Sequence, residues 1–251
     1  MSADAHIRLI EVTKSYGNQQ VLQGVTFDVL RGQTNMVIGR SGSGKSVLMR
    51  QIIRLEEPDS GSIIVDGMDI AHLSEGKLMT VRPKFGMVFQ MSALFDSLTV
   101  FDNVAFPLQE HTKLNKKQIH ERVMEKLSAL GIADAWDKLP SQISGGMAKR
   151  AAVARALVIE PQILIYDEPT SGLDPIGART VDDMIAEMQA RFSVTALVIS
   201  HDIESVTRIA DRVNLLHNGQ IILSSTPQEL LASDHPVVRE YLKAAGQLLP
   251  V

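Results

Sequence analysis

The chain of 251 residues contains no cysteine. Disulfide bonds and metal sites that depend on thiolate ligands are therefore excluded. The absence is also typical of a protein in a reducing compartment such as the cytosol. Apart from His201, which is considered below, the histidines show no ligand spacing, so a histidine-based metal site is not expected either.

The chain also lacks a hydrophobic run long enough to cross a membrane. Its apolar runs are short, as in Ile163–Tyr166 and Ala196–Ile199, whereas a spanning helix needs roughly 20 apolar residues. The first residues, Met1–Glu11, include Asp4 and His6 and do not form the apolar segment of a signal peptide. If the protein serves a membrane, we expect a separate chain to cross it.

Neither sign of charge dominates the composition. Lysine and arginine number 25, aspartate and glutamate number 29, and the formal net charge is −4. Hydrophobic residues make up 45% of the chain and charged residues 22%, which is ordinary for a globular protein. The total charge does not favour nucleic-acid binding, so no nucleic-acid partner is expected.

Short apolar strands alternate with amphipathic helices, which favours an α/β fold with a largely parallel sheet. The Asn218-Gly219 turn predicts an antiparallel hairpin. We expect Leu55 and Ile176 on buried helix faces. The expected strands are Ile7–Thr13, Val21–Leu30, Asn35–Ile38, Ser62–Val65, Phe85–Phe89, Ile163–Tyr166, Ala196–Ser200, Val213–His217 and Gln220–Ser224. The expected helices are Lys45–Leu55, Lys116–Leu130, Gly145–Ile159 and Pro175–Phe192.

A glycine-rich motif follows the strand Asn35–Ile38 and opens the helix that begins at Lys45. Its glycines let successive main-chain N–H groups point at phosphate oxygens, and the helix N-terminus attracts the same anion. Lys45 should reach the β- and γ-phosphates, and Ser46 should bind Mg²⁺. The expected nucleotide-binding residues are Gly39, Arg40, Ser41, Gly42, Ser43, Gly44, Lys45, Ser46 and Val47.

A second apolar strand, Ile163–Tyr166, ends in the two acids Asp167 and Glu168. A buried strand that delivers carboxylates to a phosphate site is the Walker B arrangement. We therefore expect Asp167 to hold Mg²⁺ through water and Glu168 to polarise the attacking water. The phosphate-binding loop upstream disfavours the ordinary alternative, solvated acids at a strand end.

A second anion-binding helix terminus lies between these two motifs. Ser144, Gly145 and Gly146 open a helix, where a hydroxyl and main-chain N–H groups can cradle another phosphate. Because the first loop already binds one ATP, we expect this second helix terminus to bind the γ-phosphate of a different nucleotide. The stretch from Ile143 to Met147 resembles the LSGGQ signature of ABC-type ATPases, with Ile in place of Leu and Met in place of Gln.

The resemblance to ABC-type ATPases covers residues 7–225. It implies a P-loop NTPase fold: a RecA-like core with a mostly parallel sheet, an antiparallel β region and an inserted α-helical subdomain. Residues 1–93 and 162–225 would form the ATP-binding core, 94–161 the helical signature subdomain and 226–251 a helical C-terminal tail. The resemblance further implies ATP and Mg²⁺ as ligands and a head-to-tail homodimer.

The same resemblance assigns roles to single residues. Tyr16 matches the aromatic residue that stacks on adenine, and Gln90 matches the glutamine that senses Mg²⁺ and water. The stretch that ends at Asp174 resembles the D-loop, and His201 matches the switch histidine that contacts the γ-phosphate. The implied catalytic residues are Lys45, Gln90, Glu168 and His201; the implied Mg²⁺ ligands are Ser46, Gln90 and Asp167; and the implied contacts to the partner's ATP are Ser144, Gly145, Gly146 and Met147.

Three stretches are similar to the ATPases of Mla/Mce-type phospholipid transport systems. They are the segment from Met91 to Thr112, the run Ser144–Arg150, in which Met147 is the usual variation, and the tail Ala232–Tyr241. The similarity implies that phospholipid or another hydrophobic lipid moves between membranes, which maintains outer-membrane lipid asymmetry. The protein would lie at the cytoplasmic face of the inner membrane. Its partners would be an integral permease, an Mce-domain lipid-binding protein and a small regulatory subunit.

The segment Met91–Leu108 follows Gln90, where ABC-type ATPases receive a helix of their permease. It contains three phenylalanines, two of which are candidate contacts for such a partner. The ordinary alternative for this segment is the edge of a buried helix.

Two other functions share parts of this pattern. An ABC-type importer for a polar solute such as an amino acid has the same catalytic motifs and differs in its partner. A soluble ABC-type ATPase that acts on DNA or the ribosome belongs to another class. The chain has neither the long coiled-coil insertion nor the paired ATPase units found in such proteins. A module that binds ATP without hydrolysis is disfavoured, because Lys45, Asp167, Glu168 and His201 are all present.

Overall fold

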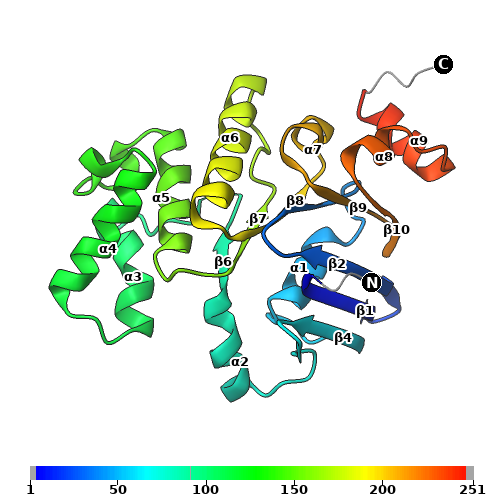
Figure 1. Ribbon diagram of the computed structural model, residues 1–251, viewed down its shortest axis with the longest axis horizontal. Helices are drawn as coiled ribbons and strands as arrows, with labels where there is room; N and C mark the ends of the chain where they lie inside the picture. Colours follow the sequence, from blue (N-terminus) through cyan, green and yellow to red (C-terminus); the bar gives the residue numbers. More distant parts are fainter. Residues whose placement is uncertain (1–3, 91, 247–251) are drawn as a thin grey trace. The chain divides into compact units, whose positions relative to one another are not determined.

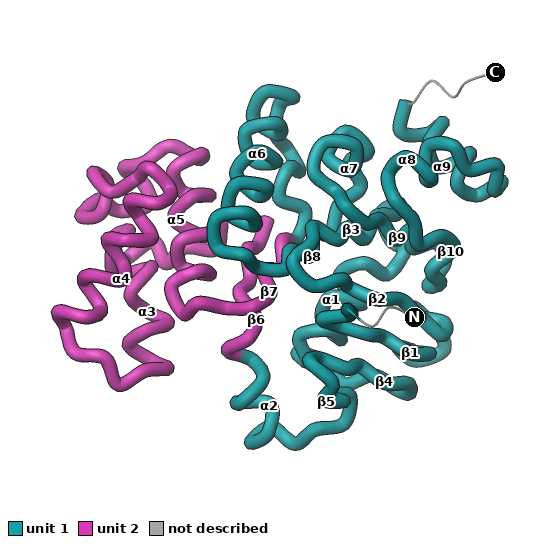
Figure 2. The backbone as a smooth tube through the Cα atoms, in the orientation of Figure 1, with its two compact units in different colours: residues 1–82, 167–251 teal, residues 83–166 magenta. Residues whose placement is uncertain are grey.

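The computed structural model describes residues 4–90 and 92–246. The chain forms two compact units, one from its 1–82 and 167–251 parts (unit 1) and one from its 83–166 part (unit 2), as Figure 2 shows. Unit 1 is therefore built from two segments that are far apart in the sequence. Met91, where the predicted permease segment begins, and residues 247–251 of the predicted tail lie outside the described residues.

Unit 1 contains an antiparallel sheet with the strand order β2-β1-β4-β5 (Figure 2). Alternate residues of β1, such as Ile7 and Leu9, are fully buried, because successive side chains of a strand point to opposite faces. The two long strands extend beyond the predicted alternation and pair from Ala5↔Leu30 to Tyr16↔Gln19. The strands are β1 (Ala5–Tyr16), β2 (Gln19–Leu30), β4 (Ser60–Val65) and β5 (Met68–Asp69).

Parallel strands in unit 1 carry the predicted phosphate-binding loop. Strand β3 (Thr34–Ile38) lies between β8 (Thr195–Ser200) and β9 (Arg212–His217) and runs parallel to both. Every residue of β3 and β8 is buried, as is usual for parallel strands. Strand β10 (Gln220–Ser225) pairs with β9 in antiparallel fashion, which confirms the predicted hairpin.

Helix α6 of unit 1 has the predicted bounds. Asp174 sets its start, because the Asp174 carboxylate accepts a hydrogen bond from the Gly177 N–H at 2.8 Å. Helices α8 and α9 lie near β10 (Figure 1). Among the described residues, no helix is both long and apolar enough to cross a membrane. The helices are α1 (Lys45–Ile52), α2 (Glu75–Val81), α6 (Pro175–Phe192), α7 (Ile203–Ile209), α8 (Pro227–Leu231) and α9 (Pro236–Ala244).

Unit 2 combines a parallel strand pair with helices. Strand β6 (Phe85–Val88) pairs with β7 (Ile163–Asp167), whose last residue belongs to unit 1. Helix α3 packs against α4 and α5, and α5 packs against β6. The helices are α3 (Val100–His111), α4 (Lys116–Ala129) and α5 (Gly145–Leu157), and short 3-10 turns cover Arg82–Lys84, Ala133–Ala135 and Pro140–Gln142. The mixture of parallel and antiparallel strands with helices confirms the predicted fold class.

Several details differ from the prediction. Helix α5 ends at Leu157 rather than Ile159, and α3 is not among the predicted helices. Helix α1 ends at Ile52 rather than Leu55, and Leu55 is 60% exposed, because the chain turns away from the helix after Ile53. Ile176 is 81% exposed, since it lies in the first turn of α6, before the helix reaches the core. Helices α2 and α7 were not predicted, because seven residues each are too few to show helical periodicity.

The predicted helical subdomain, 94–161, lies within unit 2. Unit 2 also includes β6 and most of β7, which the prediction assigned to the ATP-binding core. The division of the chain by function, with a core, a signature subdomain and a tail, stays a prediction.

A buried asparagine fixes the start of β3. Asn35 is 0% exposed, and its Oδ1 accepts a hydrogen bond from the Leu30 N–H at 2.7 Å. Its Nδ2 donates to the main-chain oxygens of Leu30 at 2.9 Å and Gln33 at 3.1 Å. The amide therefore closes the connection between β2 and β3 and sets where β3 begins.

We expect Asn35→Ala to lower the free energy of unfolding by about 2–3 kcal/mol, because it removes two hydrogen bonds to the main chain of Leu30 and one to that of Gln33. Urea unfolding measures this change. Asn18→Ala, in an exposed turn, is the matched control and should change the free energy by less than about 0.5 kcal/mol. Equal effects of the two substitutions would contradict this account of Asn35.

Candidate active site

The predicted phosphate-binding loop joins β3 to α1, and its shape depends on two glycines. A Cβ at Gly39 would lie 2.3 Å from the main-chain oxygen of Leu216 and 2.7 Å from the Ser43 hydroxyl. Gly44 has a φ of 105°, in the left-handed region that residues with a side chain rarely adopt. The loop can therefore close this tightly only with glycine at both positions.

Helix α1 begins without a side-chain cap at its N-terminus. Leu48 donates its N–H to the Gly44 oxygen at 2.8 Å, but the N–H groups of the first turn have no partner within a helix. The helix dipole adds positive potential at the same end. This turn, which includes the exposed Ser46 and Val47, is therefore suited to bind an anion.

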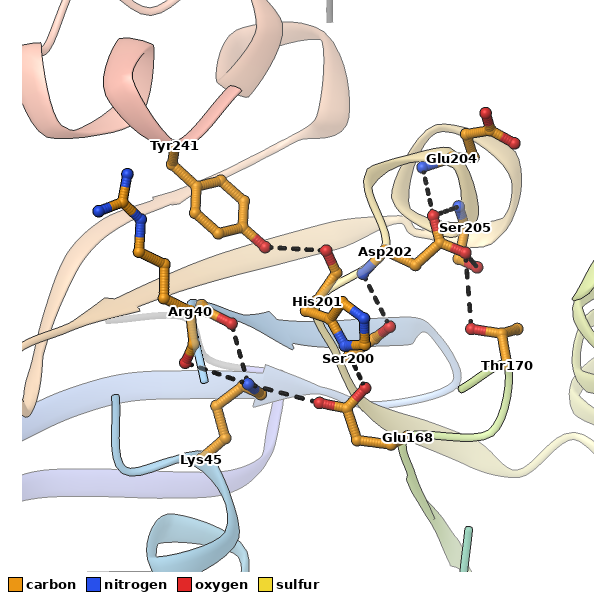
Figure 3. A network of polar contacts seen from close by, with 11 residues as sticks. Arg40, Lys45, Glu168, Thr170, Ser200, His201, Asp202, Glu204, Ser205 and Tyr241 are labelled. Atoms are coloured by element: carbon orange, nitrogen blue, oxygen red, sulfur yellow. Dashed lines mark hydrogen bonds and ion pairs between the residues drawn. The ribbon is translucent and has the colours of Figure 1, made fainter. Parts of the chain in front are cut away.

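Lys45 is a buried cation at the centre of the site. Its side chain is 8% exposed, and its Nζ donates to the main-chain oxygens of Gly39 at 2.9 Å and Arg40 at 3.3 Å. An oxygen of Glu168 lies 3.4 Å from the same ammonium group (Figure 3). A buried ammonium group needs such partners, and the phosphates of a nucleotide would replace them with stronger charge-assisted bonds.

Glu168 lies between Lys45 and His201. One carboxylate oxygen faces Lys45 and the other lies 2.7 Å from Nδ1 of His201 (Figure 3). The main chain of Glu168 has a φ of 47°, which is uncommon for a residue with a side chain, and its N–H donates to the Ile199 oxygen at 2.8 Å. The hydrogen bond to β8 therefore holds Glu168 in a conformation that directs its carboxylate to both Lys45 and His201.

Asp167 precedes Glu168 and carries an oxygen suited to a metal ion. Its Oδ1 is buried and has no hydrogen-bond partner among the described residues. Burial and then the negative charge of Glu168 raise the pKa of Asp167, against the opposing charges of Lys45 and Arg50. A nearby cation would oppose both causes of the raised pKa of Asp167. Together with the exposed hydroxyl of Ser46, this carboxylate offers the oxygen ligands that Mg²⁺ prefers, so these residues fit the ion.

The segment after β8 is fixed by Asp202, a residue without a predicted role. Its carboxylate caps α7 by accepting hydrogen bonds from the N–H groups of Glu204 at 2.9 Å and Ser205 at 3.4 Å. It also accepts from the hydroxyls of Ser205 at 2.9 Å and Thr170 at 3.5 Å (Figure 3). Because Thr170 directly precedes the predicted D-loop, Asp202 links that loop to the segment of His201.

Tyr16 is the last residue of β1, and its side chain is partly exposed at 43%. Its hydroxyl donates to Glu56, and Nζ of Lys14 lies 5.8 Å from the centre of the ring. A partly exposed aromatic ring whose polar end is held is suited to stack on a planar base.

The remaining predicted residues belong to unit 2. Gln90 is exposed and follows β6. Ser144 caps α5, and its hydroxyl accepts a hydrogen bond from the Met147 N–H at 3.3 Å. A Cβ at Gly145 would meet no heavy atom within 4 Å, so this helix terminus is open locally. Direct contacts thus join Lys45, Glu168 and His201 within unit 1, whereas Gln90 and the residues from Ser144 to Met147 lie in unit 2.

Tyr241 contacts the site without having been predicted as part of it. Its hydroxyl donates to the main-chain oxygen of His201 at 3.1 Å (Figure 3). The contact joins residues 40 positions apart, and no short motif around Tyr241 signals it. Asp202, in contrast, could have been found from its position as a helix cap.

Comparison with known proteins identifies relatives across most of the chain. A model of the family described as ABC transporter matches residues 22–171. "Intermembrane phospholipid transport system ATP-binding protein MlaF" of Escherichia coli is 41% identical over 232 residues, which are 92% of this chain and 86% of that protein.

A second relative is "Probable ribonucleotide transport ATP-binding protein mkl" of Mycobacterium tuberculosis. It is 42% identical over 231 residues, which are 92% of this chain and 64% of that protein, so the chain spans less than two thirds of its length. Among solved structures, a dimer of the ATP-binding cassette MJ0796 in a post-hydrolysis state with ADP and Pi has a TM-score of 0.78. The two are 29% identical, and the match covers 88% of this chain and 98% of that one.

We expect Gly39→Ala to weaken nucleotide binding at least about tenfold, a loss of about 1.4 kcal/mol, because the added methyl group would displace the loop from Leu216. Titration with a fluorescent ATP analogue measures the affinity. Gly76→Ala is the matched control, since a Cβ at Gly76 meets no atom within 4 Å. Unchanged affinity in the Gly39 variant would contradict the description of the loop.

Proposed function

Because the chain belongs to the family of ABC transporter ATPases, we propose that its ATP hydrolysis drives a membrane complex that moves phospholipid or another hydrophobic lipid between membranes. The observation that carries the ATPase part is the convergence of Lys45, Glu168 and His201 beside the phosphate-binding loop. The observation that supports the lipid cargo is the 41% identity to a phospholipid transport ATPase over 92% of the chain.

In the proposed mechanism, the triphosphate of ATP binds to the loop Gly39–Ser46 and to the first turn of α1, including Val47. Lys45 leaves its partners Gly39, Arg40 and Glu168 and contacts the β- and γ-phosphates instead. That exchange releases one side of the Glu168 carboxylate, which can then accept a hydrogen bond from the attacking water. Binding of ATP therefore prepares the base.

Glu168 orients and polarises the water that attacks the γ-phosphate, and His201 holds that phosphate through its imidazole. The Mg²⁺ ligands would be Ser46, Asp167 and Gln90, and the ion would neutralise charge on the phosphate oxygens. Tyr16 stacks on the adenine ring. The contacts among Lys45, Glu168 and His201 in unit 1 support their roles, and the other assignments follow the family pattern.

The residues from Ser144 to Met147 bind the γ-phosphate of ATP held by a second subunit, so that two chains enclose two nucleotides. Asp174 and its D-loop couple the two sites. The open helix terminus at Ser144 supports this role, as does the dimeric solved structure of a related cassette. ATP then acts as a ligand that strongly favours the closed dimer, and hydrolysis removes that preference.

An integral permease docks into an apolar groove of unit 2. The groove has a volume of about 340 Å³, and large exposed apolar side chains at such a groove are typical of a docking site. Two of the three phenylalanines in the predicted permease segment, Phe95 and Phe106, line it with ring centres 5.1 Å apart. The third, Phe101, contacts His120 and Trp136 instead.

Arg155 holds the rim of this groove in place. Its guanidinium group donates to the main-chain oxygens of Ala93 at 2.7 Å and Ser92 at 3.0 Å. Both of these residues have a positive φ, a conformation that needs support from its surroundings. A preformed rim lowers the entropy that a docking helix must overcome.

The proposed complex also contains an Mce-domain lipid-binding protein and a small regulatory subunit, and the ATPase is peripheral to the cytoplasmic face of the inner membrane. Its activity would maintain the lipid asymmetry of the outer membrane. A polar cargo is the second candidate, favoured by the name of the mycobacterial relative, which indicates ribonucleotide transport. Both candidates use the same ATPase chemistry and differ in the partner.

Purification of the Glu168→Gln protein from native membranes in the presence of ATP, followed by mass spectrometry, tests the cargo. Recovery of a permease with an Mce-domain protein and phospholipid supports the proposal. Recovery of a permease with a solute-binding protein would overturn the lipid cargo and leave the ATPase assignments in place.

We expect Glu168→Gln to lower ATP turnover by about two orders of magnitude or more, since a positioned base contributes that much. Nucleotide affinity should be retained, and light scattering should show a dimer trapped by ATP. Glu187→Gln, on the exposed face of α6, is the matched control and should turn over ATP normally. Normal turnover in the Glu168 variant would show that another group is the base.

We expect Phe95→Glu to abolish co-purification with the permease, because the groove would have to bury a charge. ATP affinity of the isolated protein should not change. Met79→Glu, at an exposed apolar position outside the groove, is the control and should co-purify as the native protein does. Retention of the permease by the Phe95 variant would place the docking site elsewhere.

A further inference from the structure

Helix α9 contacts two segments that flank the proposed γ-phosphate position. Tyr241 reaches the main-chain oxygen of His201, and Glu240 binds Arg40 of the phosphate-binding loop at 3.0 Å (Figure 3 shows Tyr241, His201 and Arg40). The helix is anchored by Val238 and Leu242, which are both 0% exposed. The tail of the chain is thus attached directly to the active site.

The two contacts of α9 differ in their surroundings. The side chains of Arg40 and Glu240 are 49% and 64% exposed, and such ion pairs contribute little. Tyr241 is 7% exposed. The pKa of its hydroxyl is raised, first by burial and then by the charge of Glu168, although a main-chain hydrogen bond from Gly39 opposes the shift. The tyrosine therefore makes the more specific contact.

We propose that Tyr241 is a positioning residue for His201. Its hydroxyl fixes the main chain of His201, so that the imidazole on the same residue faces Glu168 at 2.7 Å. The side chain of His201 is itself 59% exposed, and the contact with Glu168 is the one hydrogen bond of the imidazole that is seen among the described residues. The hydrogen bond from Tyr241 restricts the main chain from which the imidazole projects.

This inference rests on the proposed role of His201 in hydrolysis. Helix α9, which lies outside the family match at residues 22–171, would then help to set the rate of ATP hydrolysis. A tyrosine that only filled space would work as well without its hydroxyl. The hydroxyl is therefore the group to remove.

The test compares Tyr241→Phe with the native chain in the complex purified from native membranes. We expect kcat to fall about fivefold to tenfold, as the loss of the hydrogen bond to His201 allows, while KM changes by less than about twofold and the melting temperature falls by only a few degrees. Tyr166→Phe is the matched control, because the buried hydroxyl of Tyr166 has no partner among the described residues, and its kcat should not change.

A second readout follows the histidine itself. The imidazole NMR signals of His201, assigned by their loss in His201→Ala, should shift in Tyr241→Phe and not in Tyr166→Phe. An unchanged kcat in Tyr241→Phe would overturn the proposal, and so would a lower kcat without a shift of the His201 signals. Normal turnover by His201→Ala would instead overturn the proposed role of the histidine.

Discussion

The buried positive charge of Lys45 is the constraint around which unit 1 arranges its site. An ammonium group that is this little exposed needs partners on several sides, and Gly39, Arg40 and Glu168 supply them. The glycine at position 39 lets the main chain approach closely. Glu168 is in turn held by its main-chain hydrogen bond to β8 and by its contact with His201. The arrangement suits a nucleotide, because its phosphates can replace each of the partners of the Lys45 ammonium group.

The parts of the site that are formed by neighbouring residues could be predicted from the sequence, because their conformation depends on interactions between residues close together in the chain. A strand, a glycine-rich turn and a helix start follow each other directly between Asn35 and Ile52, and the cap at Asp174 places the start of α6 as predicted. The contact between Tyr241 and His201 could not be predicted, since it depends on how a distant helix packs. The same is true of Arg155, whose hydrogen bonds to Ser92 and Ala93 have no sequence signature.

The distribution of motifs between the two units has a functional consequence. The phosphate-binding loop and Glu168 belong to unit 1, and the signature at Ser144 belongs to unit 2. Each unit thus contains one helix N-terminus suited to bind phosphate, and the groove lined by Phe95 and Phe106 is part of unit 2 as well. A permease that holds unit 2 would therefore hold the element that the proposed dimer uses to sense the partner's ATP.

The most direct test of this account asks whether the signature meets a nucleotide in another chain. The chain has no cysteine, so cysteines placed at Ser41 and Ser144 would be the only thiols. In the Glu168→Gln background with ATP, a short bismaleimide should link the two positions between chains and give a covalent dimer on a denaturing gel. A link that forms within one chain, and leaves only monomer, would contradict the proposed arrangement.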